Sequence, residues 1–427
     1  MTAHTLADPH DRHSTSYMVR VIAAASIGNA LEWFDLLIYG YFAVTLSRLF
    51  FPADDDFVAL MLTFGTFAVA YLVRPVGAIF IGAYADRHGR KAALMLSILL
   101  MMVGTAVMTV VPTYASIGVA APIAVLAARL LQGFSVGGEF GSSTAFMVEH
   151  SATRKGFLAS WQWSSQGVAA MLASGFGVLL FGTLSQDKLQ AWGWRLPFAF
   201  GLLIGPIGLY IRSHLEEAPE FASVQASRTP LRDLIGQQWG RTLLSIGAVI
   251  LSTSSNYVIL YMPTYGIKEL GLPQSVGFTA TLMGAIVLTV VSPLVGHWSD
   301  KVGRTWIMIA VSMLFAVSAY PTFVELVEYP SLTTIVLIVG WMSLLKAGYS
   351  GVLPALMSEI FPTQTRASGL SLSYNIGVPL FGGAAPLYIT ALIDLTGSSL
   401  VPSYYLIATA LLSLAVLLTI RARLGLR

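Results

Sequence analysis

The chain has 427 residues, of which 56% are hydrophobic and only 11% are charged, and its mean hydropathy is +0.73. Soluble domains carry about 25% charged residues, so this composition excludes a soluble globular protein and predicts an integral membrane protein. The net charge of +3 does not indicate nucleic-acid binding, because the basic residues lie mainly in short connections between apolar runs.

Residues 1–16 are polar and contain no apolar signal-peptide core, so we expect an N-terminal tail and a first span that acts as its own insertion signal. Twelve apolar runs follow, each close to the roughly 20 residues that a helix needs to cross a bilayer. Their apolar character is continuous rather than alternating, which predicts helices and not barrel strands. The predicted spans are 18–46, 57–84, 92–111, 117–146, 156–182, 196–212, 241–264, 274–298, 305–326, 331–357, 367–394 and 402–420.

These spans predict an all-α membrane protein built from two pseudo-symmetric bundles of six helices. We expect a cytoplasmic tail at 1–16, an N-terminal bundle at 17–212, a cytoplasmic loop between the bundles at 213–240, and a C-terminal bundle at 241–427. Most of the 24 Lys and Arg residues fall in connections on one side of this arrangement. The positive-inside rule therefore predicts that both termini are cytoplasmic.

A short charged motif occurs once in each half, where a predicted span ends. Residues 82–91 read GAYADRHGRK, and residues 296–304 read GHWSDKVGR, about half the chain later. An acidic residue at the end of a later span recurs at nearly the same offset, which predicts two homologous halves. We expect Asp86 and Asp300 to lie near helix N-termini. The residues of this motif are Gly82, Asp86, Arg87, Gly89, Arg90, Lys91 and Glu149 in the first half, and Asp300, Gly303, Arg304 and Glu359 in the second.

The repeated motif resembles the signature loop of the major facilitator superfamily. Further stretches are similar to its metabolite–proton symporter family: 28–35 (GNALEWFD), 74–77 (RPVG), 129–139 (RLLQGFSVGGE), 192–198 (WGWRLPF) and 261–265 (YMPTY). The resemblance covers nearly the whole chain. It implies the twelve-helix fold of that superfamily, a multi-pass protein of the bacterial inner membrane, and a motif that closes the cytoplasmic gate through Arg90–Glu149 and Arg304–Glu359 pairs.

Members of that family transport citrate, α-ketoglutarate, shikimate, or osmolytes such as proline and betaine. This chain departs from the pattern at Lys301, which replaces an arginine of the motif, and at Lys346, a lysine inside a predicted span. The osmolyte sensors of the family carry a long C-terminal coiled coil that this sequence does not show, so we expect a different branch of the family.

Ionisable side chains inside a membrane cost roughly 3 kcal/mol or more at mid-depth, so they normally face a wet cavity or one another. A rise of about 1.5 Å per residue places Glu32, Asp35 and Arg129 near the midplane. Lys346 and Asn256 fall at a similar depth in the other half. We therefore expect one central cavity between the bundles, in which Lys346 faces Arg129.

Arg129 is the first candidate for binding an anionic substrate, because a guanidinium can hold a carboxylate through two hydrogen bonds. The alternative is a permanent structural pair with a carboxylate. Lys346 would supply a second positive charge, which suits a di- or tricarboxylate better than a zwitterion; alternatively it pairs with a neighbouring helix. The polar candidates, for which helix–helix hydrogen bonding is the alternative, are Gln132, Gln162, Gln166, Asn256, Tyr257, Asn375 and Tyr39.

Three acidic residues are candidates for carrying a coupling proton: Asp35, Glu32 and Glu139. Burial and mutual repulsion favour the protonated form of a carboxyl group. Protonation would release Arg129 for the substrate, so that proton and anion cross together. Glu139 lies nearer the cytoplasmic end of its span, where it could instead pair with arginines of the loops.

We expect secondary active transport by alternating access: proton-coupled uptake of a small organic acid, with a di- or tricarboxylate such as citrate, tricarballylate or α-ketoglutarate as the leading class. The alternatives are a zwitterionic osmolyte such as proline or betaine, or a monocarboxylate such as shikimate. An enzyme is not expected, because the sequence has no cysteine and no HExxH motif. We expect no cofactor other than the proton, no metal, no nucleic-acid partner, and a monomer in the lipid bilayer.

Overall fold

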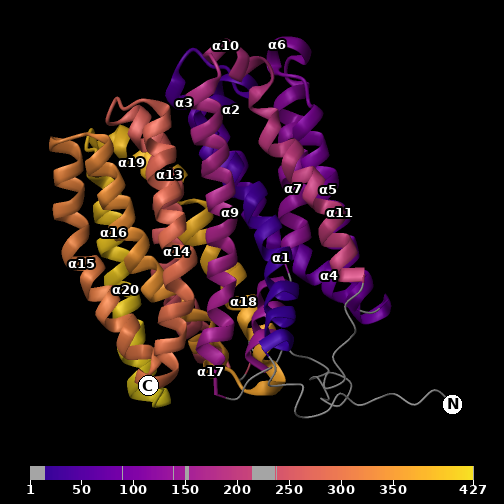
Figure 1. Cartoon of the computed structure of the whole chain (residues 1–427), viewed down its shortest axis with the longest axis vertical. Helices are drawn as coiled ribbons and strands as arrows, with labels where there is room; N and C mark the ends of the chain where they lie inside the picture. The colour runs from indigo at the N-terminus through magenta and orange to yellow at the C-terminus, as the bar shows by residue number, and fades with distance from the viewer. Residues whose placement is uncertain are drawn as a thin grey trace.

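The computed structural model describes residues 15–88, 90–137, 139–149, 153–213, 236 and 238–426. Nearly all of these residues are helical, and the long helices run side by side along the longest axis of the molecule (Figure 1). Twelve segments cross the described part of the chain from one end to the other, which confirms the predicted all-α class and the twelve-helix arrangement. The α1 helix begins, and α20 ends, at the same end of the molecule (Figure 1).

The first half of the chain contains six of the crossing segments. Three of them are broken into two helices each, namely α1 with α2, α3 with α4, and α7 with α8. The helices are α1 (Thr15–Tyr41), α2 (Ala43–Phe50), α3 (Asp56–Leu72), α4 (Arg74–His88), α5 (Arg90–Val110), α6 (Tyr114–Ile117), α7 (Ala120–Val136), α8 (Glu139–Glu149), α9 (Lys155–Thr183), α10 (Gln186–Lys188), the π-helical turn η2 (Leu189–Gly193) and α11 (Arg195–Ser213).

The second half contains the other six crossing segments. Two of them are broken, α16 with α17 and α18 with α19. The helices are α13 (Trp239–Lys268), α14 (Gln274–Val302), α15 (Arg304–Glu328), α16 (Leu332–Ser350), α17 (Leu353–Ile360), the 3₁₀ turn η4 (Thr363–Thr365), α18 (Arg366–Val378), the π-helical turn η5 (Pro379–Gly383), α19 (Ala385–Thr396) and α20 (Val401–Leu424).

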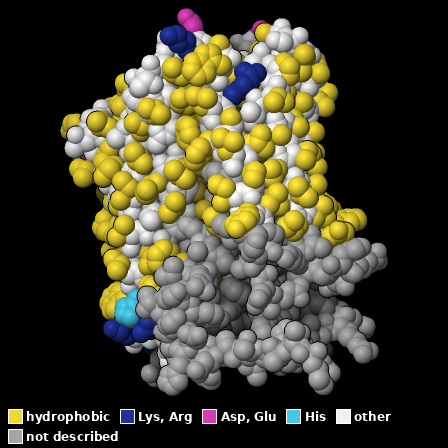
Figure 2. Space-filling model, turned by 45° about the vertical axis from the view of Figure 1, so that its right-hand side comes forward, with side chains coloured by type: hydrophobic (Ala, Val, Ile, Leu, Met, Phe, Trp, Pro, Cys, Tyr) yellow, Lys and Arg dark blue, Asp and Glu magenta, His cyan; other side chains and the backbone are white. Residues whose placement is uncertain are grey.

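The outer surface of the described region suits a lipid environment. Eight helical stretches in the described residues are long and apolar enough to cross a membrane, and two shorter apolar helices accompany them. Figure 2 shows hydrophobic side chains over the flank of the molecule, with Lys and Arg side chains near its ends. Because lipid offers no hydrogen bonds, the helical backbone must satisfy its own polar groups, as it does here.

The two halves meet through close helix pairs, above all α9 with α14 and α8 with α18. In Figure 1 α9 and α14 lie next to each other at the centre of the molecule. A Cβ atom added to Gly296 would lie 2.6 Å from the carbonyl oxygen of Gly156, so only glycine permits this approach. Small residues at such a contact let helix backbones come close in a membrane.

Candidate functional site

A cavity lies between the two halves, and we call it the inter-bundle cavity. The volume open to the centres of water molecules is about 20 Å³, enough for one or two waters. Helices α1 and α9 of the first half and α13, α14 and α16 of the second contribute its walls. Its lining residues are Trp33, Leu37, Tyr41, Gln166, Ala170, Asn256, Ile259, Thr281, Gly284, Ala285, Leu288, Ser343 and Lys346.

Lys346 is the only charged residue among those that line this cavity, and its side chain is 3% exposed. Its Nζ donates a hydrogen bond to Oδ1 of Asn256 and lies 5.4 Å from the ring centroid of Trp163. Among the described residues, no carboxylate lies within ion-pair distance of Lys346. A buried ammonium group without a carboxylate partner is costly, so this arrangement favours an anionic ligand.

Several polar atoms around Lys346 have unused hydrogen-bonding capacity. Among the described atoms, Nδ2 of Asn256, Nε1 of Trp163, and Nε2 and Oε1 of Gln166 have no hydrogen-bond partner of good geometry, although the Gln166 and Tyr374 side chains interact. Buried polar atoms normally have partners, so each exception needs an explanation. One ammonium, two amide groups and one indole N–H form a set of donors that carboxylate oxygens can satisfy.

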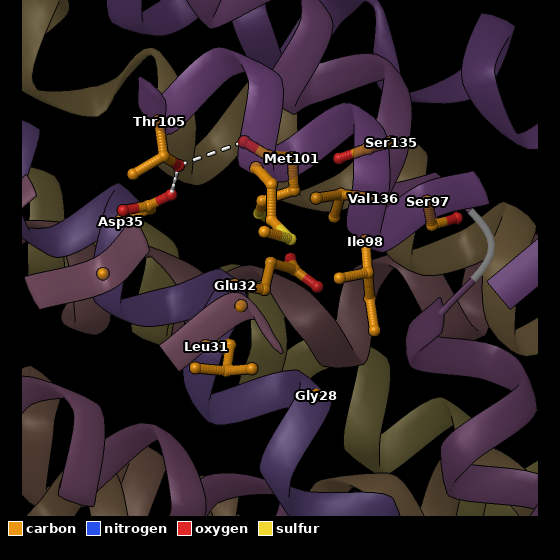
Figure 3. A pocket seen from close by; sticks show the side chains of 13 residues that line it. Gly28, Leu31, Glu32, Asp35, Ser97, Ile98, Met101, Thr105, Ser135 and Val136 are labelled. Carbon is orange, nitrogen blue, oxygen red and sulfur yellow. Dashed lines mark hydrogen bonds between the residues drawn. The ribbon is translucent and has the colours of Figure 1, made fainter. Parts of the chain in front are cut away.

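The predicted acidic residues of α1 lie elsewhere, inside the first half. Asp35 accepts hydrogen bonds at Oδ2 from the Thr105 hydroxyl on α5 and from Nε2 of Gln132 on α7, the latter at 3.2 Å. Its Oδ1 has no partner. It lines a cavity, the first-half cavity, that is shown in Figure 3 and is formed by α1, α5, α7 and α11.

Arg129 lies in a smaller cavity that adjoins the first-half cavity and shares Glu32 and Asp35 with it. The guanidinium stacks on the Tyr39 ring, with Cζ 4.1 Å from the centroid, and its Nε and Nη2 have no hydrogen-bond partner. The charges of Arg129 and Asp35 interact, but the two side chains are not within ion-pair distance. Asp35, Arg129, Gln132 and Tyr39 thus lie close together, but inside the first bundle rather than in the cavity between the bundles where we expected them.

The expectation that Lys346 faces Arg129 across one central cavity is wrong. The inter-bundle cavity shares no lining residue with the first-half cavity or with the smaller cavity that Arg129 lines. Helix α1 separates them: Trp33, Leu37 and Tyr41 line the inter-bundle cavity, while Glu32 and Asp35 line the first-half cavity. Both sets follow helical spacing, so the sequence indicates two faces of α1 but does not show that each face lines a different cavity.

Four predicted polar candidates form hydrogen bonds between helices and line none of the three cavities described here. Gln162 donates to Oδ1 of Asn29 at 3.0 Å, and Asn375 donates to the carbonyl oxygen of Gly137 at 2.6 Å. Tyr257 donates to the Tyr71 hydroxyl. The fourth, Tyr39, donates to the carbonyl oxygen of Thr63 at 3.2 Å. These contacts match the alternative interpretation, in which such groups join helices.

A chain of contacts that the sequence did not reveal connects the first-half cavity to the second half. Glu32 Oε1 lies 3.7 Å from Nη2 of Arg74, and the Arg74 guanidinium lies 4.1 Å from the centroid of Tyr71. Tyr71 accepts the hydrogen bond of Tyr257 on α13. The aromatic residues look like ordinary core residues in sequence, and only their placement shows that they join the halves.

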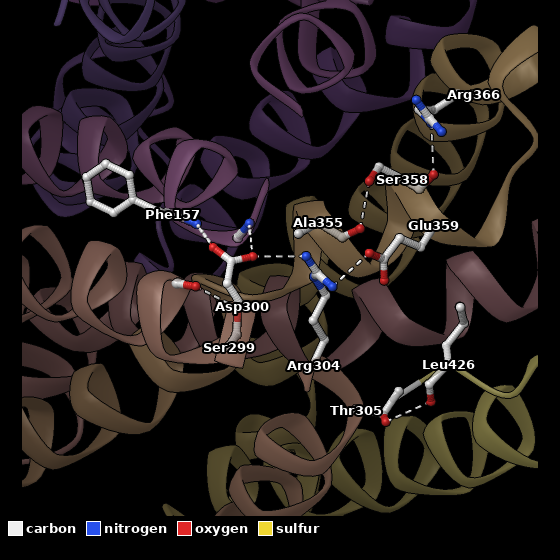
Figure 4. Close-up of polar contacts among 12 residues, drawn as sticks. Phe157, Ser299, Asp300, Arg304, Thr305, Ala355, Ser358, Glu359, Arg366 and Leu426 are labelled. Carbon is white, nitrogen blue, oxygen red and sulfur yellow. Dashed lines mark hydrogen bonds and ion pairs between the residues drawn. The ribbon is translucent and has the colours of Figure 1, made fainter. Parts of the chain in front are cut away.

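The repeated motif of the second half lies at the end of the molecule where α1 begins (Figure 4). Asp300 accepts hydrogen bonds from the backbone N–H groups of Gly156 (2.8 Å) and Phe157 (3.1 Å), at the start of α9 in the other half. Arg304 lies 3.1 Å from Asp300 and 2.7 Å from Glu359, so the predicted Arg304–Glu359 pair is confirmed. The acidic residue thus binds a helix N-terminus, as the motif predicted.

Gly303 separates α14 from α15 with a φ of +99°, a backbone conformation that residues other than glycine rarely adopt. Several predicted residues lie outside the described part of the chain. They are Gly89 as a whole and the side-chain positions of Gly82, Asp86, Arg87, Arg90, Lys91, Glu139 and Glu149. The predicted Arg90–Glu149 pair and the predicted role of Glu139 therefore stay predictions.

The opposite end of the molecule is also closed. Lys268 at the end of α13 binds Asp56 at the start of α3, with Nζ and Oδ2 2.6 Å apart. The rings of Phe42 and Phe181 from the first half also pack on Phe278 from the second, at centroid distances of 5.6 and 4.9 Å. Among the described residues, the halves therefore contact each other at both ends of the molecule, with the small inter-bundle cavity between these contacts.

Comparisons with known proteins follow the same division into halves. The family model for sugar (and other) transporters matches twice, over residues 21–230 and 222–422. The citrate-proton symporter of Klebsiella pneumoniae is 37% identical over 93% of this chain and 90% of its own length. The glycine betaine/proline/ectoine/pipecolic acid transporter OusA of Dickeya dadantii is 34% identical, with coverage of 92% and 81%. The α-ketoglutarate permease of Escherichia coli is 32% identical, with coverage of 87% and 86%.

Solved structures show the same fold. The proton:xylose symporter XylE of E. coli, bound to 6-bromo-6-deoxy-D-glucose, superimposes with a TM-score of 0.78 over 96% of both chains at 16% identity. A partially occluded inward-open conformation of XylE gives a TM-score of 0.73 at 17% identity, over 96% of this chain and 98% of that chain. At such identities the likeness concerns the fold alone.

Proposed function

We propose that this chain, which belongs to the sugar (and other) transporter family of the major facilitator superfamily and there to the metabolite–proton symporters, takes up a small organic acid together with protons. The relatives described above are transporters, symporters or permeases rather than enzymes. We further propose a di- or tricarboxylate as substrate, of the size of citrate, tricarballylate or α-ketoglutarate. We place the protein in a bacterial inner membrane, as a monomer.

The observation that carries this proposal is Lys346 in the inter-bundle cavity. The cavity lies between the halves, where alternating access exposes a site to each side of the membrane in turn. One carboxylate of the substrate would bind Lys346, and the donors of Asn256 and Gln166 would bind its remaining oxygens. At about 20 Å³ the cavity is too small for such a molecule in this structure, so binding requires the helices to separate.

Asp35 supports the proton part of the proposal. It is 5% exposed, and its Oδ1 has no hydrogen-bond partner, so a proton can be added there. When Asp35 is ionised, the positive charge of Arg129 stabilises it, and Nε and Nη2 of Arg129 have no hydrogen-bond partner of their own. Proton binding at Asp35 would weaken that attraction and let α1 and α7 move relative to each other.

The alternative substrate is a zwitterionic osmolyte, and one observation favours it. The cavity wall contains Trp33 and Tyr41, and Trp163 lies beside it. Aromatic rings bind quaternary ammonium groups. However, the positive charge of Lys346 would repel such a cation, so we favour the anion.

A thermal-shift screen of the purified protein tests the proposal directly, with citrate, tricarballylate, α-ketoglutarate, shikimate, proline and betaine as ligands. A ligand present at about 100 times its Kd stabilises the folded state by roughly 2.7 kcal/mol. We expect stabilisation by a di- or tricarboxylate. Stabilisation by betaine or proline alone would establish the osmolyte alternative, and stabilisation by shikimate alone would establish a monocarboxylate substrate.

A further inference from the structure

We propose that the proton travels through the first-half cavity, along a water route inside the first bundle that is separate from the path of the substrate. The route runs from Asp35 toward the end of the molecule at which α1 begins, which the charge distribution predicts to be cytoplasmic. The inference rests on the proposed function, because it assigns a route to the proton of that symport.

The first-half cavity extends along the bundle rather than across it. Asp35 and Thr105 lie on one side of the hollow in Figure 3, and Ser97 lies on the other. Ser97, Met101 and Thr105 are four residues apart on α5, so they share one helix face, and at 1.5 Å per residue they cover about 12 Å. Ser97 lies two turns after the start of α5, at the end where α1 also begins.

The size and lining of this cavity suit water and exclude an organic acid. The volume open to the centres of water molecules is about 40 Å³, room for roughly three waters at 10–15 Å³ each. The hydroxyl groups of Ser97, Ser135 and Thr105 line it and can exchange hydrogen bonds with such waters. A proton leaves Asp35 when its O–H bond breaks and a water oxygen binds the proton, which leaves the carboxylate behind.

The walls of the first-half cavity separate it from the inter-bundle cavity. Helices α5 and α11, which contribute Ser97 and Gly205, pack on helices of their own half. The two cavities have no lining residue in common. Moreover, Lys346 would repel an excess proton in the inter-bundle cavity, whereas the carboxylates Asp35 and Glu32 of the first-half cavity attract it.

Few charges surround Asp35. Arg129 approaches it from α7, Glu32 lies one turn before it on α1, and Arg74 from α4 pairs with Glu32. The residues that α5 and α11 contribute to the cavity are uncharged. On the side of the cavity that leads away from Asp35, Glu32 is the one charged lining residue, and Ser97 contributes a neutral hydroxyl group. A proton that leaves Asp35 therefore passes Glu32 and then meets only uncharged lining residues.

Cysteine labelling tests the route, because the chain has no cysteine of its own. Ser97→Cys is compared with Leu99→Cys, which lies two residues away on the lipid-facing side, where Leu99 is 48% exposed. The probe is methanethiosulfonate ethylammonium, added to either side of proteoliposomes of known orientation. Because reaction needs a hydrated thiolate, we expect Ser97→Cys to react about tenfold faster than Leu99→Cys, from the end at which α1 begins. Equal rates, or reaction only from the opposite end, would overturn the proposal.

A plugging variant adds a functional readout. Ser97→Leu fills the cavity, while Leu99→Phe adds bulk to the lipid-facing side of the same turn as a matched control. We expect Ser97→Leu to slow acid-driven net uptake of citrate about fivefold or more. Exchange of internal for external citrate should be maintained, because only net uptake must release the proton. Unimpaired net uptake by Ser97→Leu contradicts the route. If Ser97→Leu also loses exchange, the labelling rates decide; if the parent accumulates no carboxylate, the proposed function fails instead.

Discussion

At the scale of single residues, two buried charges have different surroundings and therefore different expected roles. Lys346 has an amide, an aromatic ring and unused donors around it, while Arg129 has an aromatic ring and a nearby carboxylate. A buried positive charge with no carboxylate partner among the described residues is suited to bind an anionic ligand. A group with a titratable neighbour is suited to respond to the proton.

Replacement of Lys346 by methionine keeps most of the side-chain volume and removes the charge. A hydrogen bond to a charged group contributes about 1.5–3 kcal/mol, so we expect the apparent affinity for a di- or tricarboxylate to fall about tenfold or more. Uptake of a monocarboxylate should fall much less. Competition assays in vesicles measure both, with Lys188→Met, at an exposed position, as the control. Equal effects on both substrate classes would contradict the assignment of Lys346.

Replacement of Asp35 by asparagine keeps the shape of the side chain and removes the titratable proton. We expect pH-driven accumulation of substrate to be abolished, because a proton can no longer bind and leave at this position. Exchange of internal for external substrate should stay within about threefold of the parent, because it needs no net proton movement. Flux assays with and without a pH gradient separate the two. Accumulation by Asp35→Asn at the parental level would refute the role of Asp35.

At the scale of elements, α1 shows what could be predicted from the sequence and what could not. The spacing of Glu32 and Asp35 predicted correctly that they share a face, and depth along the helix predicted their burial. The spacing could not show what that face packs against, because this depends on the rotation of α1 relative to α5, α7 and α9. Long-range packing sets that rotation, and a single sequence does not display it.

The contact between α3 and α7 gives a test of packing at this scale. A Cβ atom at Gly133 on α7 would collide with the carbonyl oxygen of Ala70 on α3, whereas a Cβ at Gly65 on α3 would meet nothing within 4 Å. We expect Gly133→Ala to lower the thermal unfolding midpoint by several degrees, since overpacking costs about 1–3 kcal/mol. Gly65→Ala should leave it unchanged or raise it slightly. The same midpoint for both variants would show that the helices can move apart at little cost.

At the scale of the whole molecule, the two closed ends differ in strength. The pair of Asp56 and Lys268 is exposed, with 61% of the Asp56 side chain accessible, and such pairs contribute about 0–1 kcal/mol. Asp300 is 8% exposed and binds two backbone N–H groups together with Arg304. The repeated sequence motif predicted the contacts of Asp300 and Arg304 at this end. No sequence motif predicted the contacts at the other end, where the Asp56–Lys268 ion pair, the hydrogen bond between Gln186 and Gln274 and aromatic packing join the halves.

This difference predicts that two alanine substitutions change access to the inter-bundle cavity by unequal amounts. Access is measured as the rate at which a thiol reagent labels a cysteine introduced by Ser343→Cys, because Ser343 lines this cavity. Asp300→Ala should raise the labelling rate from the end at which α1 begins by about tenfold or more, because charge-assisted hydrogen bonds between the halves are lost. Asp56→Ala should raise labelling from the opposite end by less than about fivefold. A larger effect of Asp56→Ala would contradict the proposal that the contacts at the Asp300 end are the stronger ones.

The central claim is that this protein couples a proton to an organic anion. Its most direct test is the pH of a lightly buffered suspension of vesicles that contain the purified protein, recorded after addition of citrate, tricarballylate or α-ketoglutarate. We predict that at least one of these acids alkalinises the medium as protons enter with it, and that Asp35→Asn vesicles do not respond. No alkalinisation with any carboxylate, together with a clear response to proline or betaine, would contradict the claim.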